Sequence, residues 1–169
     1  SKSTRFRWSQ PVGFEPAHTW AIRYVYIGDE CMDLCSGHGR CDVGICVCDD
    51  AWAGDTCNIP LKPLPKQLRD KFEKPPDKAW ITVNGGLISD ICEPLPSGKA
   101  LHFYGACTRQ LITTDLDLSE VKLLQFYFKY GCMSVPSNRN QGVFVEYSVN
   151  GGISWQPLTE LFYDQFTQP

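Results

Sequence analysis

The stretch that decides the fold runs from residue 31 to residue 57 and reads CMDLCSGHGRCDVGICVCDDAWAGDTC. Its six cysteines follow the spacing C-x3-C-x5-C-x4-C-x-C-x8-C. Few apolar side chains that could form a core accompany them, chiefly Val43, Ile45, Val47 and Trp52. A module this small cannot build an adequate core, so it needs covalent cross-links, and six cysteines can supply three of them. The cysteine count alone leaves the pairing open.

A zinc site is the alternative for a cysteine cluster. Zinc sites usually combine C-x2-C pairs with further cysteines or histidines at set distances. Here the short spacings are C-x3-C and C-x-C, and the nearby histidine is His38. The chain has nine cysteines in total, which indicates an oxidising compartment and therefore a secreted protein. The sequence favours disulfides over zinc.

The end of this stretch has a recognisable pattern, C-x-C-x5-G-x2-C, formed by Cys46, Cys48, Gly54 and Cys57. It resembles the end of an EGF-like module. The resemblance implies that the first cysteine pairs with the third, the second with the fourth and the fifth with the sixth: Cys31–Cys41, Cys35–Cys46 and Cys48–Cys57. Gly54 suits a tight turn with positive φ, and we expect Trp52 to pack on the last disulfide loop.

The remaining composition excludes several partners. The formal net charge is -3, and basic residues are scattered outside the segment 62–78, so nucleic acid has little support. No apolar run is long enough to cross a bilayer. The amino terminus lacks an apolar signal segment, and we expect a mature piece of a larger secreted protein.

Alternating apolar and polar residues predict β-strands on both sides of the module. Residues 1–29 alternate around Phe6 and Trp8 and again over 20–27, and further alternation occurs near 80–83, 101–104, 123–130 and 143–149. Short strands separated by turn residues predict an all-β fold of the sandwich or jelly-roll type. Residues 59–79 are rich in proline and form a connector, in which Leu64, Leu68 and Phe72 have the spacing of a short helical turn.

A second motif, Ser148-Val-Asn150-Gly-Gly152-Ile-Ser-Trp155, predicts a tight hairpin at Asn-Gly. It resembles an Asp-box, also called a BNR motif, with Asn150 where aspartate is usual. The resemblance implies that the polar side chains of Ser148 and Asn150 bind turn amides and that Trp155 packs beneath the hairpin. Asparagine still accepts such hydrogen bonds and tolerates left-handed backbone. The motif is expected to be structural.

The order of these parts resembles a reelin repeat, in which an EGF-like module separates subrepeats A and B. The likeness rests on Thr4–Pro11, Trp20–Ile22, Leu68–Glu73, Gly85-Gly86, Leu116-Asp117 and the Asp-box. It implies the end of a jelly-roll subrepeat A over 1–29, an EGF-like module over 30–58, a connector over 59–79 and the start of subrepeat B over 80–169. Both subrepeats would be incomplete, so we expect exposed apolar strand edges. The alternative is that residues 1–27 complete the sheet of 80–169.

The resemblance also suggests a calcium ion. Asp115 and Asp117 are the side-chain candidates, because Ca²⁺ prefers hard oxygen ligands, and the alternative is a solvated acidic turn. Three cysteines remain outside the module, and an odd number leaves one unpaired. The resemblance favours Cys92–Cys132. Cys107 would then be a free or buried thiol, or would link two chains as a disulfide-bonded homo-oligomer.

Two functions stay open. The first is a segment of a secreted signalling glycoprotein of the extracellular matrix, which sets the geometry of a rod of repeats and presents surface to cell-surface receptors. Resemblance implies receptors of the low-density lipoprotein receptor family, with neighbouring repeats of the same chain as further partners. The second is a secreted carbohydrate-binding or glycosidase-like jelly-roll module, with Tyr104, Tyr127 and Trp155 as candidate sugar contacts. No catalytic motif is present in the sequence, and we expect no enzyme.

Overall fold

The computed structural model describes residues 3–9, 22, 25, 27–91, 98–105, 108–120, 123–130 and 142–162. The chain has an all-β fold, and the 3-10 helix η1 (Met32–Gly37) is the one helical element in these ranges. The strands are β1 (Gly39–Asp42), β2 (Ile45–Cys48), β3 (Trp52–Ala53), β4 (Ile59–Pro60), β5 (Trp80–Asn84), β6 (Gly86–Ser89), β7 (Ala100–Phe103), β8 (Gln110–Thr113), β9 (Val143–Tyr147) and β10 (Gln156–Leu161). None of the described helical residues form a segment long and apolar enough for a membrane span.

Residues 31–60, called the small module below, are held by disulfides. Antiparallel β1 and β2 pair with Cys41 opposite Cys46, and β3 pairs with β4. The three bridges are Cys31–Cys41, Cys35–Cys46 and Cys48–Cys57, as the EGF-like resemblance implies. The buried apolar core of the described residues consists of Cys31, Cys35 and Cys57, with Trp52 packed against it. The centre of the module is therefore sulfur rather than aliphatic side chains.

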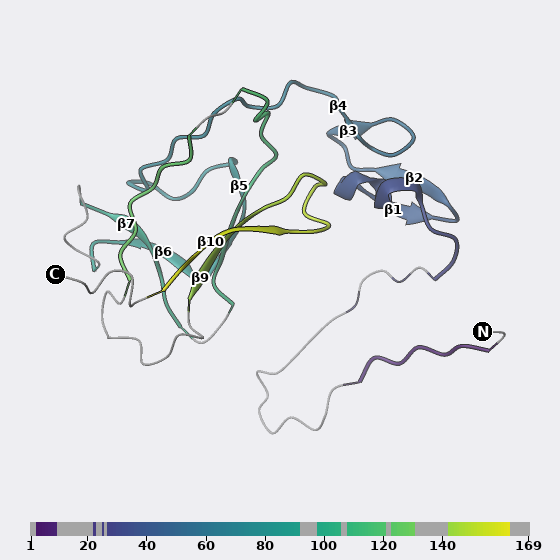
Figure 1. The fold of residues 1–169 in the computed structure, drawn as a ribbon, viewed down its shortest axis with the longest axis horizontal. Coiled ribbons are helices and arrows are strands. Elements are labelled where there is room, and N and C mark those ends of the chain that lie inside the picture. Colours follow the sequence, from purple (N-terminus) through teal and green to yellow (C-terminus); the bar gives the residue numbers. More distant parts are fainter. Residues whose placement is uncertain are drawn as a thin grey trace.

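The described residues from 80 to 162 are called the β-rich region, and their strands pair two by two. The antiparallel pairs are β5 with β8, β6 with β7, and β9 with β10. Gly85, with φ of 67°, separates β5 from β6, so the turn at Asn84-Gly85-Gly86 sends the chain from one pair to the next. In Figure 1 the loop between β9 and β10 reaches out of this region toward η1.

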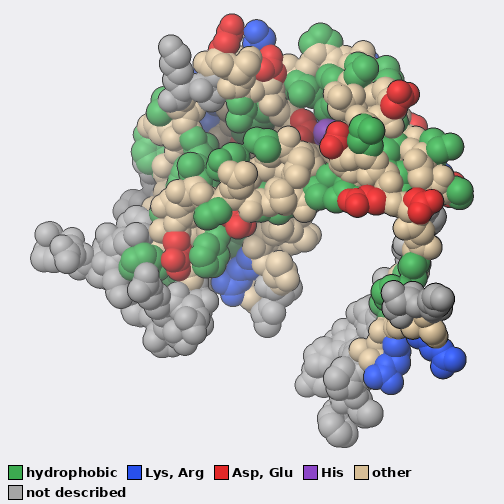
Figure 2. Space-filling model, turned by 45° about the vertical axis from the view of Figure 1, so that its right-hand side comes forward, with side chains coloured by type: hydrophobic (Ala, Val, Ile, Leu, Met, Phe, Trp, Pro, Cys, Tyr) green, Lys and Arg blue, Asp and Glu red, His purple; other side chains and the backbone are tan. Residues whose placement is uncertain are grey.

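Apolar side chains of the β-rich region are widely exposed. Ile81 is 67% exposed and Phe144 61%, and Figure 2 shows hydrophobic side chains spread over the visible face. Apolar side chains of the described strands are thus exposed, as expected, and the origin of this exposure in incomplete subrepeats stays a prediction. Such surface is normally covered by a further segment or partner.

Some expected elements do not form. The described residues 3–9 are exposed and form no strand. None of the described residues between 3 and 27 belongs to a strand paired with the β-rich region. They therefore do not support the alternative in which residues 1–27 complete that sheet. Residues 123–130 form no strand. The connector has no helical turn, and Phe72 has a positive φ of 53°. Side-chain periodicity is a local signal, whereas a strand also needs a neighbour in register, which the pattern does not specify.

Candidate functional site

The site begins at a left-handed turn in η1. Four successive residues, Asp33 to Ser36, have φ between 49° and 56°. Left-handed backbone costs about 1–2 kcal/mol for each residue with a side chain, so the turn must be held from outside. Disulfides from the buried Cys31 and Cys35 anchor it to β1 and β2. The rigidly held turn presents Ser36, Gly37 and His38 at one edge of the small module.

His38 is fixed on three sides. Its ring stacks on Trp52 of β3, with 3.4 Å between ring centroids and 5° between ring planes. Its carbonyl oxygen accepts a hydrogen bond from the Asp49 N–H at 2.8 Å. Its Nε2 lies 3.2 Å from Oδ2 of Asp115, which belongs to the β-rich region. The imidazole therefore links the disulfide core of the module to the neighbouring region.

Asp115 is positioned by its backbone neighbours. Thr114 donates its N–H to the Ala79 carbonyl, and Asp117 donates its N–H to the Pro65 carbonyl, both at 2.9 Å. These two bonds hold the segment that follows β8 against the connector. The carboxylate of Asp115 is 44% exposed, whereas the His38 side chain is only 13% exposed.

The Asp-box hairpin lies opposite the turn at Ser36–His38. Ser148 Oγ accepts hydrogen bonds from the N–H groups of Gly152 at 2.8 Å and Asn150 at 3.2 Å. Asn150 Oδ1 accepts the Ser154 N–H at 3.0 Å, and its Nδ2 donates to Ser154 Oγ at 2.9 Å. Asparagine thus performs the turn-capping role that the resemblance implies for this position. Trp155 lies below the turn, with its ring carbon 3.4 Å from a Cβ added to Gly152, and remains 41% exposed.

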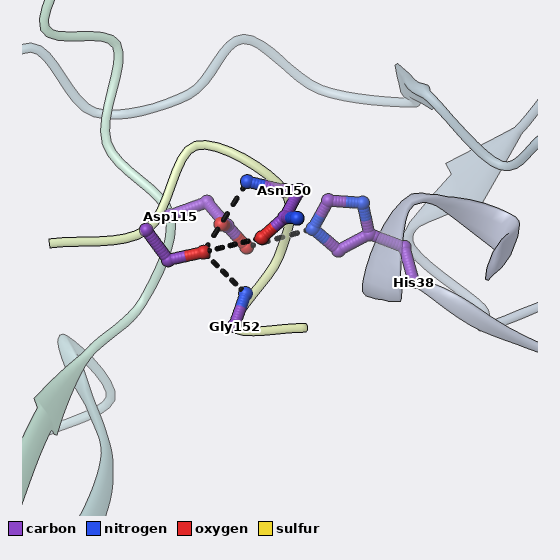
Figure 3. Close-up of polar contacts among 5 residues, drawn as sticks. His38, Asp115, Asn150 and Gly152 are labelled. Carbon is purple, nitrogen blue, oxygen red and sulfur yellow. Dashed lines mark hydrogen bonds and ion pairs between the residues drawn. The ribbon is translucent and has the colours of Figure 1, made fainter. Parts of the chain in front are cut away.

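The turn at Ser36–His38 and the tip of the hairpin meet without room for side chains at Gly37 and Gly151. A Cβ added to Gly37 would lie 2.6 Å from the Gly151 carbonyl oxygen and 2.8 Å from that of Asn150. A Cβ added to Gly151 would overlap the Ser36 carbonyl oxygen and lie 2.9 Å from His38 Nε2. Figure 3 shows His38 from the module, Asp115 and the Asn150–Gly152 tip converging at this point. We call this contact the joint, formed by Ser36, Gly37, His38, Asp115, Asn150 and Gly151.

The tether across the joint is short. Leu61 donates its N–H to Ala51 of the small module, and the Pro65 carbonyl is bound by Asp117 of the β-rich region, each at 2.9 Å. Residues 62–64 alone bridge these two anchor points. A short tether keeps the turn and the hairpin tip at a high effective concentration, so even weak contacts between them form for much of the time.

Asp117 points to a different partner from Asp115. Its carboxylate accepts hydrogen bonds from the Ser119 hydroxyl at 2.7 Å and the Ser119 N–H at 3.1 Å. These two bonds lower the pKa of Asp117 below its ordinary value, since they stabilise the charged form. Neither aspartate belongs to a group of three or more metal-ligating side chains among the described residues. The calcium site at Asp115 and Asp117 stays a prediction.

The other cysteine expectations have different outcomes. The Sγ atoms of Cys31, Cys35 and Cys46 lie within 4.8 Å of one another, but all three are in disulfides and offer no thiolate for zinc. Cys92, Cys107 and Cys132 lie outside the described residues, so their pairing stays a prediction.

Sequence reasoning found the hairpin and the disulfides but missed the joint. The sequence suggests His38 as a candidate for a zinc site and Asp115 as a calcium ligand or part of a solvated acidic turn, and neither interpretation brings the two residues together. The local signal for the joint was a glycine in each part, Gly37 in the module and Gly151 in the hairpin. At both positions the close approach of the two backbones leaves no room for a side chain. Nothing in the spacing of these residues, which are more than a hundred positions apart, pairs them.

Two family models match the chain. A model described as Reelin subrepeat B matches residues 85–169, and one described as Teneurin-like EGF domain matches residues 31–60. The first contains most of the β-rich region, including Asp115 and the Asp-box hairpin, and the second coincides with the small module. The joint therefore lies where two separately recognised domains touch.

Proposed function

The chain belongs to the reelin subrepeat B family, and from that premise we propose that it sets the geometry of a rod of repeats by locking its EGF-like module against its subrepeat. The reelin and EGF-like matches, together with the disulfides, identify a reelin-like extracellular repeat. Domains of these two kinds are typically structural modules rather than enzymes. The extracellular matrix is the proposed location.

The joint is the observation that carries this proposal. Two domains connected only by a flexible linker move independently by default. Here the turn at Ser36–His38 contacts the Asn150–Gly152 tip, His38 contacts Asp115, and residues 62–64 leave little slack. The angle between module and subrepeat is therefore defined by contacts, and a repeated fixed angle gives an extended chain of repeats a definite shape.

Presentation of receptor-binding surface follows from a fixed angle. Receptors of the low-density lipoprotein receptor family are the proposed partners, and the support is the family resemblance. A rigid joint lowers the entropy lost when a surface that spans both domains is bound. We expect variants that free the joint to bind such receptor ectodomains more weakly than the unchanged chain does.

Residual dipolar couplings from NMR test the geometric part of the proposal on the 169-residue chain. Couplings from residues 31–60 and from the β-rich region should fit one common alignment tensor. Two tensors of clearly different magnitude would mean that the domains move independently, and the proposal would then fail.

A sugar-binding role is the second candidate, because its three predicted contacts, Tyr104, Tyr127 and Trp155, are 54%, 70% and 41% exposed. Exposed aromatic rings can stack on sugars. A glycan array with the same chain separates the two candidates. Specific binding that is lost in Tyr127→Ala would favour the sugar-binding role, and an array without signal would remove it.

A further inference from the structure

The tetrapeptide Val-Asn-Gly-Gly occurs twice in the β-rich region, at residues 83–86 and at residues 149–152. Asparagine followed by glycine is especially prone to spontaneous deamidation, because glycine has no side chain to hinder attack by its backbone nitrogen. Identical neighbours give Asn84 and Asn150 the same intrinsic reactivity, so the fold must distinguish them. We propose that Asn84 is a site of spontaneous deamidation and isomerisation in the folded protein, and that Asn150 is protected from the same reaction.

The reaction needs only the chain and water. The glycine backbone nitrogen attacks Cγ of the asparagine and forms an N–Cγ bond, while the Cγ–Nδ2 bond breaks and Nδ2 leaves as ammonia with the proton that the glycine nitrogen gives up. Water then adds to either carbonyl carbon of the five-membered succinimide and breaks the bond from that carbon to the glycine nitrogen, which regains a proton. Attack at the side-chain carbonyl gives aspartate, and attack at the main-chain carbonyl gives isoaspartate, whose backbone is one methylene longer.

Asn84 is free to react. It is the last residue of β5, and its side chain is exposed and makes no hydrogen bond with the described residues. The N–H of Gly85, which is the attacking group, has no hydrogen-bond acceptor among them either. The amide of Asn84 can therefore turn toward the Gly85 nitrogen without losing a contact.

Asn150 has the same attacking group, since the Gly151 N–H also has no acceptor in the described part of the chain. Its side chain, however, is held. Oδ1 accepts hydrogen bonds from the Ser154 N–H at 3.0 Å and the Ser148 hydroxyl at 2.9 Å, and Nδ2 donates to Ser154 Oγ at 2.9 Å. The Asn150 carbonyl oxygen accepts the Ile153 N–H at 3.2 Å, which fixes the peptide unit whose nitrogen would have to approach Cγ.

These hydrogen bonds set the difference in rate. Rotation of the Asn150 amide toward the Gly151 nitrogen breaks its side-chain hydrogen bonds, and water replaces them only in part. We expect Asn84 to deamidate about thirtyfold faster than Asn150 in the folded chain, which corresponds to about 2 kcal/mol. The unfolded chain should show no such difference, because the two tetrapeptides are identical.

Isoaspartate in place of Asn84 should disturb the turn between β5 and β6. The Gly85 carbonyl oxygen accepts the Tyr104 N–H at 3.1 Å. Gly86 lies so close to β7 that an added Cβ would be 3.0 Å from the Phe103 ring. A longer backbone shifts both glycines relative to β7, so the hydrogen bond of Tyr104 should weaken and its amide should exchange faster.

Peptide mapping by mass spectrometry measures both sites in one sample of the folded 169-residue chain, held at neutral pH in ¹⁸O-labelled water and digested in acid, where the reaction is slow. The label enters the new carboxyl group and marks deamidation that occurred during the incubation. The reduced and denatured chain is the reference, because both asparagines are then free. Neither Asn84 nor Gly85 belongs to the joint, so failure of this test would leave the proposed function intact.

Ser148→Ala is the test variant, since it removes one hydrogen bond to Asn150 Oδ1 and the acceptor of two N–H groups of the tip. Asn150 should then deamidate about fivefold faster, and Asn84 should keep its rate. Asn84→Gln is the control for the structural effect, because glutamine would have to form a six-membered ring and reacts slowly. In Asn84→Gln the Tyr104 amide should exchange no faster after incubation than before.

Faster deamidation at Asn84 than at Asn150 in the folded chain, together with equal rates in the denatured chain, supports the proposal. Equal rates in the folded chain, or a faster reaction at Asn150, would overturn it. The proposal also fails if Asn150 reacts as slowly in Ser148→Ala as in the unchanged chain, because the hydrogen bonds would then not be what protects it.

Discussion

Replacing Gly37 by alanine should open the joint. The added methyl group would lie 2.6 Å from the Gly151 carbonyl oxygen and 2.8 Å from that of Asn150. Both obstacles are backbone atoms, so neither can rotate away as a side chain would. The module and the hairpin must move apart, or the turn must distort.

The magnitude follows from what holds the joint closed. The partly exposed contact of His38 with Asp115 contributes about 0.5–1 kcal/mol. With close packing of the tip, the joint is stabilised by about 2 kcal/mol, which leaves about 3% open. Steric overlap of this kind costs about 1–3 kcal/mol, so open and closed forms should become about equally populated in Gly37→Ala.

Gly44→Ala is a matched control for this experiment. Gly37 has φ of 73° and Gly44 has φ of 75°, so alanine is equally strained at both positions. A Cβ at Gly44 meets nothing closer than the Asp29 Cβ at 4.0 Å. Both variants should therefore lose similar module stability, and only Gly37→Ala should free the domains.

Residual dipolar couplings and ¹⁵N relaxation are the assay, with a disulfide map to show that both variants keep the three bridges of the module. Gly37→Ala should need separate alignment tensors for the two domains, whereas Gly44→Ala should fit one. The reasoning is refuted if both variants behave alike, because strain within the turn, and not contact with the hairpin, would then explain the effect.

Three further predictions concern the elements around the joint. Ser148→Ala removes the acceptor for two N–H groups of the tip and should destabilise the hairpin by about 1–2 kcal/mol, measured as faster amide exchange at Gly152; unchanged exchange would contradict it. Ser119→Ala should raise the pKa of Asp117 toward its ordinary value in an NMR titration. Because the pKa of Asp117 is lowered in the folded protein, its ionised carboxylate stabilises the fold at pH values above the ordinary carboxyl pKa. This stabilisation is lost in strong acid, so Ser119→Ala should be less stable than the parent at neutral pH and equally stable in strong acid. Dithiothreitol should abolish the dispersed NMR signals of residues 31–60, since each bridge contributes about 2–4 kcal/mol, and a chelator should leave them unchanged. The reverse result would point to a metal-held module.

Local patterns predicted those features that depend on neighbours in sequence. The cysteine spacing resembles that of an EGF-like module, and the observed bridges are those that the resemblance implies. Asn-Gly between alternating residues predicted the hairpin of β9 and β10, and Gly54 has the positive φ, 92°, expected for its turn. In each case a few residues limit the backbone strongly enough that tertiary context adds little.

Features that depend on distant partners were not predicted. The apolar alternation near Phe6 and at 123–130 looks like that of a strand, yet the described residues there form none. Asp115 resembles a calcium ligand in isolation, and only the fold brings it to His38. Because tertiary contact is not encoded in the spacing of a single segment, residues of the joint could be assigned only after the two domains were seen together.

The contact between His38 and the hairpin tip is tested most directly by a nuclear Overhauser effect between the ring protons of His38 and the Hα protons of Gly151. A Cβ on Gly151 would lie 2.9 Å from His38 Nε2, so these protons should give a clear cross-peak in the unchanged chain, and the peak should weaken in Gly37→Ala. Absence of that cross-peak, while the disulfide-bonded module and the hairpin both give well-dispersed signals, would contradict a joint between them.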